Sequence, residues 1–398
     1  MPSTAAFRHD PLKYVLPGRP AGPSRWDREP AVCGHRRHRH HNTVLDRELP
    51  VPVSASPAVV DGVGAVFATD DGRIRFYDPT LSKAYWERRL DSSVYASLVV
   101  DTARRRVVVA GTSGLVTCFD LRGRLAWSTG LSVPVFATPT VLPDSDLLAV
   151  AGFHSRLFGL DLDSGAIVFD RVLPAPWSVK YGGTAAYRDP YASPATTSEG
   201  TVIVCCAELV LCLDAAGNEL WRHDLGCAAK ASPVALHETG QVAVCPVDGR
   251  CLFLDIRTGE LQACLHLDAK ITASPAVSGR VLAVGTQTGA VAGIDITTYE
   301  RRWHAPQGAP RSYTSFTVLP SGDFVATADR GNVVCLRRDD GGFLWESSQV
   351  LGLPAHEPQM DITPVIGPDG SMYCASYEGD LYHFRFPPHA PTLEETQL

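Results

Sequence analysis

The stretch of residues 54–94 decides the fold. It begins with S-A-S-P-A-V-V (54–60), continues with A-V-F-A-T-D-D-G-R-I-R-F-Y-D (65–78) and ends with A-Y-W-E-R-R-L (84–90). A short apolar run, two alternating runs and a Trp-centred run follow one another, separated by Gly and Asp turns. Alternation with a period of two residues, bounded by such turns, is typical of β-strands. The stretch therefore predicts four strands.

The same unit recurs along the chain. A Ser-Pro marker or a variant of it opens each copy, about 41 residues after the last, except for intervals of 55 and 48 residues before the fourth and eighth copies. A residue-Gly pair such as Asp71-Gly72, and a Trp followed four residues later by Leu, repeat in phase with the marker. A period of this length indicates a propeller or another repeat architecture, and the markers predict eight blades. The markers are Ser56, Ser97, Thr138, Ser193, Ser232, Ser274, Ser315 and Thr363.

The eighth copy lacks a Trp-centred fourth strand, because the chain meets Pro387-Pro388 after the third. In the best copies the Trp lies eleven residues before the next marker, and the same count back from Ser56 falls within residues 43–49, T-V-L-D-R-E-L. This segment is predicted to complete the last blade, which would close the ring and remove its free sheet edges. The expected fold is all-β: an eight-bladed β-propeller of four-stranded antiparallel blades, with an N-terminal strand closing the last blade. Its repeated Trp residues are expected to anchor one blade on the next, and its strand-end Asp residues to form turns.

Charge is unevenly distributed along the 398 residues. Residues 1–42 carry eight Lys or Arg against three acidic residues, although the whole chain has a net charge of −7. We expect residues 1–42 to be a disordered basic tail, residues 43–386 to form the propeller and residues 387–398 to be a C-terminal tail. The acidic ring argues against binding of nucleic acid, because phosphate contacts need clustered cations.

No apolar run of 18 residues and no N-terminal apolar segment is present, so we expect a cytoplasmic protein without a membrane span. We also expect a monomer. Its eleven cysteines are then expected to be reduced. Cys205 and Cys206 lie in an alternating run that sends their side chains to opposite faces of a strand, which favours free thiols over a vicinal disulfide. The sequence G-H-R-R-H-R-H-H (34–41) allows a transition-metal site or a basic tail, and its interleaved arginines favour the tail. We expect no metal site.

The two longer intervals contain insertions, residues 174–190 and 352–360. Both connect the outer strand of one blade to the inner strand of the next, so they lie on the same face of the ring, on opposite sides of its mouth. Long loops in compact domains are often functional. Lys230, Lys270 and Arg311, on consecutive connections of this type, would hold a carboxylate or phosphate, or else only solvate the rim and pair with nearby acids. The ligand-binding candidates are Tyr95, Tyr187, Lys230, Lys270, Arg311, Tyr313, Glu357 and Asp361.

The pattern S-P-A-V, G-x-V-x-V, G-x-L-x-x-L-D, G-x-x-x-W-x-x-x-L is clearest in residues 191–225 and 272–303. It resembles the repeat of the PQQ-like β-propellers, the quinoprotein dehydrogenase-like superfamily, over nearly all of residues 43–386. Within this superfamily the chain looks nearest to the C-terminal propeller of β-alanine-activating enzymes. The resemblance implies the fold. Its quinoprotein dehydrogenases are exported, bind Ca2+ and place a vicinal Cys pair in a loop over PQQ, whereas Cys205-Cys206 here lies in a predicted strand. We therefore expect neither PQQ nor Ca2+ nor another cofactor.

The sequence contains no G-x-S-x-G, H-E-x-x-H, Walker or dinucleotide motif. The expected function is a non-catalytic module that binds a protein partner or an anionic small molecule at the face with the insertions. The alternative is a biosynthetic enzyme with its active site at the mouth. In it, His356 or Asp189 would be the general base and the three cations would hold an anionic or carrier-bound substrate. A PQQ-dependent dehydrogenase is the third and least favoured hypothesis. The sequence leaves open whether the protein catalyses a reaction.

Overall fold

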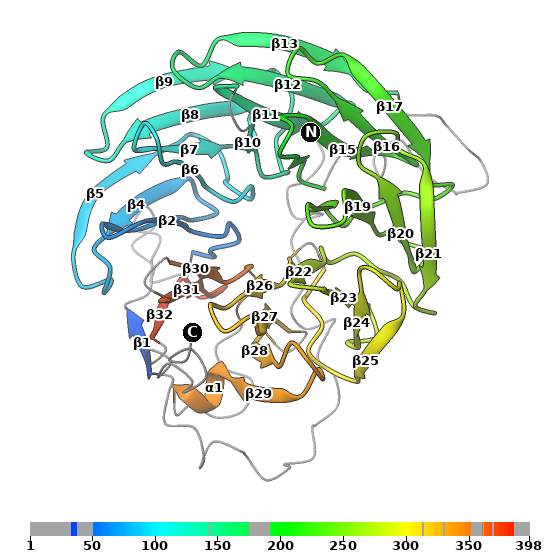
Figure 1. Cartoon of the computed structure of the whole chain (residues 1–398). Coiled ribbons are helices and arrows are strands. Elements are labelled where there is room, and N and C mark those ends of the chain that lie inside the picture. The colour runs from blue at the N-terminus through cyan, green and yellow to red at the C-terminus, as the bar shows by residue number, and fades with distance from the viewer. Residues whose placement is uncertain are drawn as a thin grey trace, which may run out of the picture.

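The computed structural model describes the backbone of residues 33–37 and, with their side chains, residues 51–142, 145–174, 192–312, 314–328, 331–351, 360, 362–367 and 370–385. These residues form eight four-stranded sheets. The sheets are arranged radially around a common axis, with the Trp-centred strands on the outer rim (Figure 1). Strand pairing within each sheet is antiparallel. The predicted eight-bladed β-propeller is confirmed.

In the first seven blades the strands run from the axis to the rim in sequence order. Blades 1 and 2 contain β2 (Ala58–Val60), β3 (Gly64–Ala68), β4 (Arg73–Tyr77) and β5 (Ala84–Arg89), then β6 (Val99–Asp101), β7 (Arg106–Ala110), β8 (Leu115–Asp120) and β9 (Leu125–Gly130). Blades 3 and 4 contain β10 (Thr140–Leu142), β11 (Leu147–Gly152), β12 (Arg156–Asp161) and β13 (Ile167–Val172), then β14 (Ala195–Thr196), β15 (Val202–Cys206), β16 (Leu209–Leu213) and β17 (Glu219–Asp224).

Blades 5 to 7 repeat this order. Blades 5 and 6 contain β18 (Val234–Leu236), β19 (Gln241–Val244), β20 (Arg250–Asp255) and β21 (Leu261–His266), then β22 (Ala276–Ser278), β23 (Val281–Gly285), β24 (Val291–Asp295) and β25 (Arg301–Ala305). Blade 7 contains β26 (Thr317–Val318), β27 (Phe324–Thr327), β28 (Val333–Leu336) and β29 (Phe343–Glu346), followed by the short helix α1 (Ser347–Val350).

Blade 8 combines the two ends of the chain. Its inner strands are β30 (Val365–Ile366), β31 (Met372–Ala375) and β32 (Leu381–Arg385), and its outer strand is β1 (Cys33–Arg37), which pairs antiparallel with β32. An N-terminal strand thus closes the last blade, as predicted. The strand is not residues 43–49, however, which lie outside the described residues. β1 also lies within residues 1–42, so these five residues of the segment expected to be a tail belong to the last blade.

The misplacement has a physical reason. The count of eleven residues assumed that the connection from this outer strand to Ser56 has the usual length, whereas β1 begins earlier in the chain. β1 joins β32 through backbone hydrogen bonds, which do not require the repeat's Trp or Leu side chains.

Tryptophan side chains join neighbouring blades, as predicted. In four of the seams between blades, the indole N–H of the outer strand donates to a carbonyl in the last turn of the next blade. Each indole ring also packs on a Gly in that turn, where a Cβ atom would lie within 3 Å of the ring. The four bonds are Trp86 to Leu121 (3.0 Å), Trp127 to Leu162 (2.9 Å), Trp221 to Ile256 (3.0 Å) and Trp303 to Arg338 (2.8 Å).

At the seam between blades 5 and 6, where the Trp is missing, an aromatic ring of the neighbouring blade fills the space. Ala263 occupies the Trp position of blade 5, as its pairing with Phe253 shows, and Tyr299 replaces the Gly in the facing turn of blade 6. Tyr299 keeps the positive φ of that glycine (59°), and its ring lies 5.0 Å from the ring of Phe253. The aromatic ring has moved to the opposite side of the seam, so the seam stays filled.

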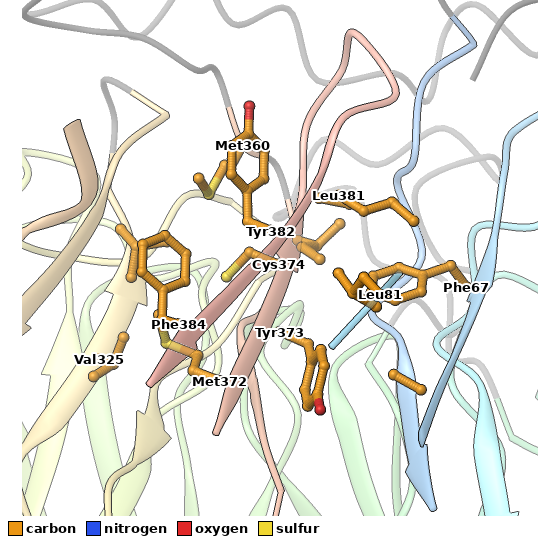
Figure 2. Packing of buried hydrophobic residues seen from close by; sticks show 14 of the residues in the cluster. Phe67, Leu81, Val325, Met360, Met372, Tyr373, Cys374, Leu381, Tyr382 and Phe384 are labelled. Carbon is orange, nitrogen blue, oxygen red and sulfur yellow. The ribbon is translucent and has the colours of Figure 1, made fainter. Parts of the chain in front are cut away.

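The seam between blades 8 and 1 uses the same solution. Leu81, with a φ of 58°, stands at the Gly position and is buried. The hydroxyl of Tyr373 donates to the carbonyl of Pro79 (2.7 Å), the position that accepts the indole N–H elsewhere. Figure 2 shows Leu81 and Phe67 of blade 1 beside Tyr373 of blade 8. The closing blade therefore shares a buried core cluster and a hydrogen bond with blade 1.

Candidate functional site

The marker residues form a ring of hydrogen bonds around the axis. In most steps the backbone amide of one marker donates to the side-chain hydroxyl of the marker in the next blade. Two steps use backbone carbonyls instead, from Ser274 to Thr314 (2.9 Å) and from Leu98 to Ser56 (3.2 Å). The hydroxyl bonds join Ser97 to Thr138 (3.0 Å), Thr138 to Ser193 (3.0 Å), Ser193 to Ser232 (2.9 Å), Ser232 to Ser274 (2.9 Å), Ser315 to Thr363 (2.9 Å) and Thr363 to Ser56 (3.1 Å).

The residue directly before each marker is buried in the described blades, for example Ala55, Ala96 and Ala137. The residue two positions before the marker lies between two buried residues and is more exposed than they are at Ser54, Tyr95, Phe136 and Lys230. We call these residues the mouth positions. In the described chain they are Ser54, Tyr95, Phe136, Lys230 and Thr272.

The hairpins between the second and third strands of the blades border the mouth positions. Their backbone amides donate to carbonyls four residues before the markers, as from Thr112 to Ser93 (2.9 Å) and from Phe153 to Pro134 (2.9 Å). Because these bonds fix each hairpin to its connection, the face around the mouth is built from two rings of loops held by backbone contacts.

An aromatic stack lies at the mouth positions of blades 2 and 3. The rings of Tyr95 and Phe136 are 5.6 Å apart and nearly parallel (10°), and Phe136 stacks on Phe153 at 4.8 Å. Tyr95 and Phe136 are half-buried. The hydroxyl oxygen of Tyr95 is enclosed and has no hydrogen-bond partner among the described residues. A stack of this kind offers an apolar aromatic contact surface at its two half-buried rings.

Small polar groups occupy other mouth positions. The hydroxyl of Ser54 donates to the buried carboxylate of Asp70 (3.1 Å). The hydroxyl of Thr272 lies 3.0 Å from that of Ser312 and accepts from the side chain of Gln287 (3.3 Å). The mouth is therefore aromatic at blades 2 and 3 and polar at blades 1 and 6.

The three predicted cations lie in three different environments. Lys230 is half-buried and Lys270 is exposed. Arg311 is 1% exposed; its guanidinium donates to the carbonyl of Met360 (3.1 Å) and lies 5.8 Å from the centre of the Tyr377 ring. Arg311 is thus part of the wall between blades 7 and 8.

Sequence reasoning missed Glu208, which is 4% exposed in the hairpin of blade 4, next to Ala207 with its positive φ. The signal was present, because an acidic residue stands where other hairpins have Gly. Six predicted residues, and the inner parts of both insertions, lie outside the described residues, so their roles remain predictions: Tyr187, Asp189, Tyr313, His356, Glu357 and Asp361.

Shifted pKa values accompany the turns and the buried thiols. The repeated strand-end aspartates, such as Asp214 and Asp295, have pKa values below the usual range. Burial of these carboxyl groups acts to raise their pKa values, but hydrogen bonds from the amides and hydroxyls of their own turns lower them by more. These residues act as turn residues, as predicted. Burial raises the pKa of the Cys118 thiol to about 12.

Cysteine pairing follows the strand alternation. Cys205 and Cys206 are free thiols that belong to different core clusters, on opposite faces of β15, which confirms the prediction for this pair. Within the described ranges, no three His, Cys, Asp or Glu side chains are grouped so that they could hold a metal ion. No helix there is long and apolar enough to span a membrane.

The family model described as outer membrane protein assembly factor BamB matches residues 19–207 and 206–386. The chain belongs to this family. The BamB family consists of PQQ-type propellers, so the resemblance to PQQ-like repeats is confirmed, whereas the closer relation to β-alanine-activating enzymes stays a prediction. No curated protein sequence matches the chain.

Solved structures agree with the BamB-type fold. BamB from Moraxella catarrhalis is 17% identical, with 90% of this chain and 99% of that chain covered and a TM-score of 0.67. Sqt1 from Saccharomyces cerevisiae is 15% identical, with coverage of 86% and 97% and a TM-score of 0.70. The computationally designed protein Ika8 is 14% identical, with coverage of 84% and 96% and a TM-score of 0.64. At these identities the likeness concerns the fold alone.

Proposed function

We propose that this BamB-family propeller is a non-catalytic binding module that holds a segment of a protein partner against its mouth. The aromatic stack of Tyr95, Phe136 and Phe153 carries the proposal. Stacked aromatic rings at a protein surface offer a large, rigid contact area at a small cost in side-chain entropy, and Tyr is enriched among residues that dominate binding energy.

Charge supports a partner segment that combines apolar and acidic residues. Lys230 and Lys270 lie on consecutive connections of the same face in a chain of net charge −7. A local positive charge in an acidic protein steers an acidic segment toward it. An anionic small molecule held by the same lysines is the second form of the proposal.

We propose further that the protein is cytoplasmic and monomeric and that it works without PQQ, Ca2+ or another cofactor. The ten described cysteines are all free thiols, which supports a reducing compartment. A relation to the propeller of β-alanine-activating enzymes would favour partners that handle carrier-bound carboxylates, and an enzymatic role at the mouth would require His356 or Asp189.

Site-directed photo-crosslinking tests the mouth. A photoreactive phenylalanine analogue is placed at Tyr95 and, as a control, at Tyr85, an aromatic residue on the outer rim that is 48% exposed. The analogue at position 95 is expected to capture a discrete partner protein that the analogue at position 85 does not capture. Equal capture at both positions would contradict a binding site at the mouth.

The affinity for the captured partner then tests the stack. We expect Tyr95→Ala with Phe136→Ala to weaken binding by at least about tenfold, since truncating one anchor of this kind costs more than about 1 kcal/mol. Tyr85→Ala should leave the affinity unchanged, and the melting temperature of each variant controls for folding. A thermal shift with dicarboxylates, nucleotides or acyl-CoA that disappears in Lys230→Ala would favour the small-molecule form instead.

A further inference from the structure

Two cysteines face each other at the end of a hairpin in blade 5. Val244 of β19 pairs with Leu252 of β20, and one further step along this antiparallel ladder places Cys245 opposite Cys251. Both side chains are fully buried and belong to the same core cluster.

This placement meets the geometric requirement for a disulfide. Directly opposite residues in an antiparallel pair have Cα atoms about 4.5 or 5.5 Å apart. Disulfides join residues whose Cα atoms are about 4.4–6.8 Å apart. Both side chains project from the same face of the sheet, because opposite residues share a face. The register therefore places the two cysteines within the range that a disulfide can span.

We propose that Cys245 and Cys251 form a reversible redox pair that hydrogen peroxide converts to a disulfide. In the reaction the peroxide O–O bond breaks and one S–S bond forms. The two thiols are oxidised by two electrons, both peroxide oxygens are reduced, and the two thiol protons leave in two water molecules. With an exposed fraction of 0% for both residues, the reaction requires transient opening of the hairpin between them.

The hairpin connects this pair to the face around the mouth. The amide of Val247 donates to the carbonyl of Ala228 (2.9 Å), and Pro246 forms a β-bridge with Ala229. Ala229 directly precedes Lys230 at the mouth position of blade 5. A disulfide at the base of the hairpin would therefore suppress its opening and fix the backbone beside Lys230. This inference is independent of the proposed partner.

Tryptic digestion gives a direct test, because Arg250 lies between the two cysteines. Cleavage after Lys230, Arg250 and Arg257 yields residues 231–250 and 251–257, each with one cysteine. After treatment of the intact protein with hydrogen peroxide, a non-reducing digest is expected to contain these two peptides linked, two hydrogens lighter than their sum. A reducing agent should separate them. The amide of Val247 should also exchange its hydrogen more slowly in the oxidised protein.

Matched variants identify the pair. Cys251→Ala should abolish the linked peptide and leave Cys245 with an added oxygen, whereas Cys212→Ala, which removes a buried thiol from blade 4, should leave the link intact. Circular dichroism confirms that each variant is folded. The wild-type digest alone can overturn the proposal. It does so if exposed Cys264 and half-buried Cys227 are oxidised while the two peptides stay separate, or if Cys245 is found linked to Cys205 across the seam.

Discussion

The backbone amide of Thr363 donates a hydrogen bond of 3.1 Å to the hydroxyl of Ser56, 307 residues away in the sequence. The amide of Ser193 makes the same bond to Ser232 in the adjacent blade (2.9 Å). Closure of the ring thus reuses the contact that joins consecutive blades. Because the acceptor is a side chain, each of these bonds can be removed by a single substitution.

Ser56→Ala is expected to lower the free energy of unfolding by about 1 kcal/mol, because it leaves the amide of Thr363 without its acceptor. Urea denaturation measures the change. Ser232→Ala is the matched control within the ring and should cost a similar amount. A loss at Ser56 below half of that at Ser232 would show that the closing bond contributes little to the ring.

Trp127→Phe should destabilise the seam between blades 2 and 3 by about 1–3 kcal/mol, since the buried carbonyl of Leu162 loses its donor. Blade 3 tests the reverse change, because Phe169 naturally takes the Trp position and packs on Gly217. Near the seam between blades 3 and 4 lies a groove of about 270 Å3 lined in part by Leu173 and Leu211. Phe169→Trp should therefore raise the melting temperature. A lower melting temperature would indicate that the indole does not fit.

The seam between blades 5 and 6 predicts a strong coupling between Ala263 and Tyr299. Ala263→Trp alone should be destabilising, because the indole would meet the Tyr299 ring, and Tyr299→Gly alone should leave a cavity. Together they recreate the Trp and Gly pair of the other seams, so the double variant should be more stable than the sum of the single changes implies. We expect a coupling of about 0.5–3 kcal/mol in a double-mutant cycle measured by urea denaturation. Additive effects would contradict the interpretation that the Tyr299 ring fills the space of the missing indole in this seam.

Stability should fall in acid because of turn aspartates such as Asp295. Despite the opposing effect of burial, hydrogen bonds from Thr297 and Thr298, with Arg280 nearby, lower the pKa of this carboxyl in the folded protein. Its contribution is complete above the unfolded pKa of about 3.9 and is lost as the pH falls through the lower folded pKa. In Asp295→Asn, the decrease in melting temperature between about pH 5 and pH 2 should be shallower than in the wild type.

Asp61→Asn is the control for this prediction. Asp61 is exposed and makes no hydrogen bond or ion pair within the described part of the chain. Its substitution should leave the slope of melting temperature against pH unchanged. A slope equal to that of the wild type in Asp295→Asn would mean that this turn does not set the acid sensitivity.

The repeat could be predicted because the same side chains make the same contacts in blade after blade. Ser and Thr at the markers accept the same amide, and each indole meets the same turn, so both recur visibly in the sequence. β1 escaped prediction because an outer strand can pair through its backbone alone. In the sequence, Ala263 and Tyr299 are visible only as exceptions to the repeated Trp and Gly. That the two residues belong to the same seam becomes clear only in the folded ring.

The mouth was less predictable. Lys270 and Arg311 both lie four residues before a marker, yet one is exposed and the other is buried. The backbone explains the difference. Lys270 offers its carbonyl to Gln287, whereas Arg311 donates its amide to Thr327, so the connection to blade 7 follows another register. Tyr95 was predicted as a ligand-binding residue, but its stacking on Phe136 depends on the distance between two connections, which sequence spacing does not give.

The composition of blade 8 has a consequence for synthesis of the protein. A ribosome releases β1 (Cys33–Arg37) long before β32 (Leu381–Arg385), the strand with which it pairs among the described residues. Blades 1 to 7 can each form as soon as their own residues emerge, but β1 must wait for almost the entire chain. During this time the backbone groups of β1 lack their partners on β32. β1 can therefore pair, and blade 8 can be completed, only at the end of translation.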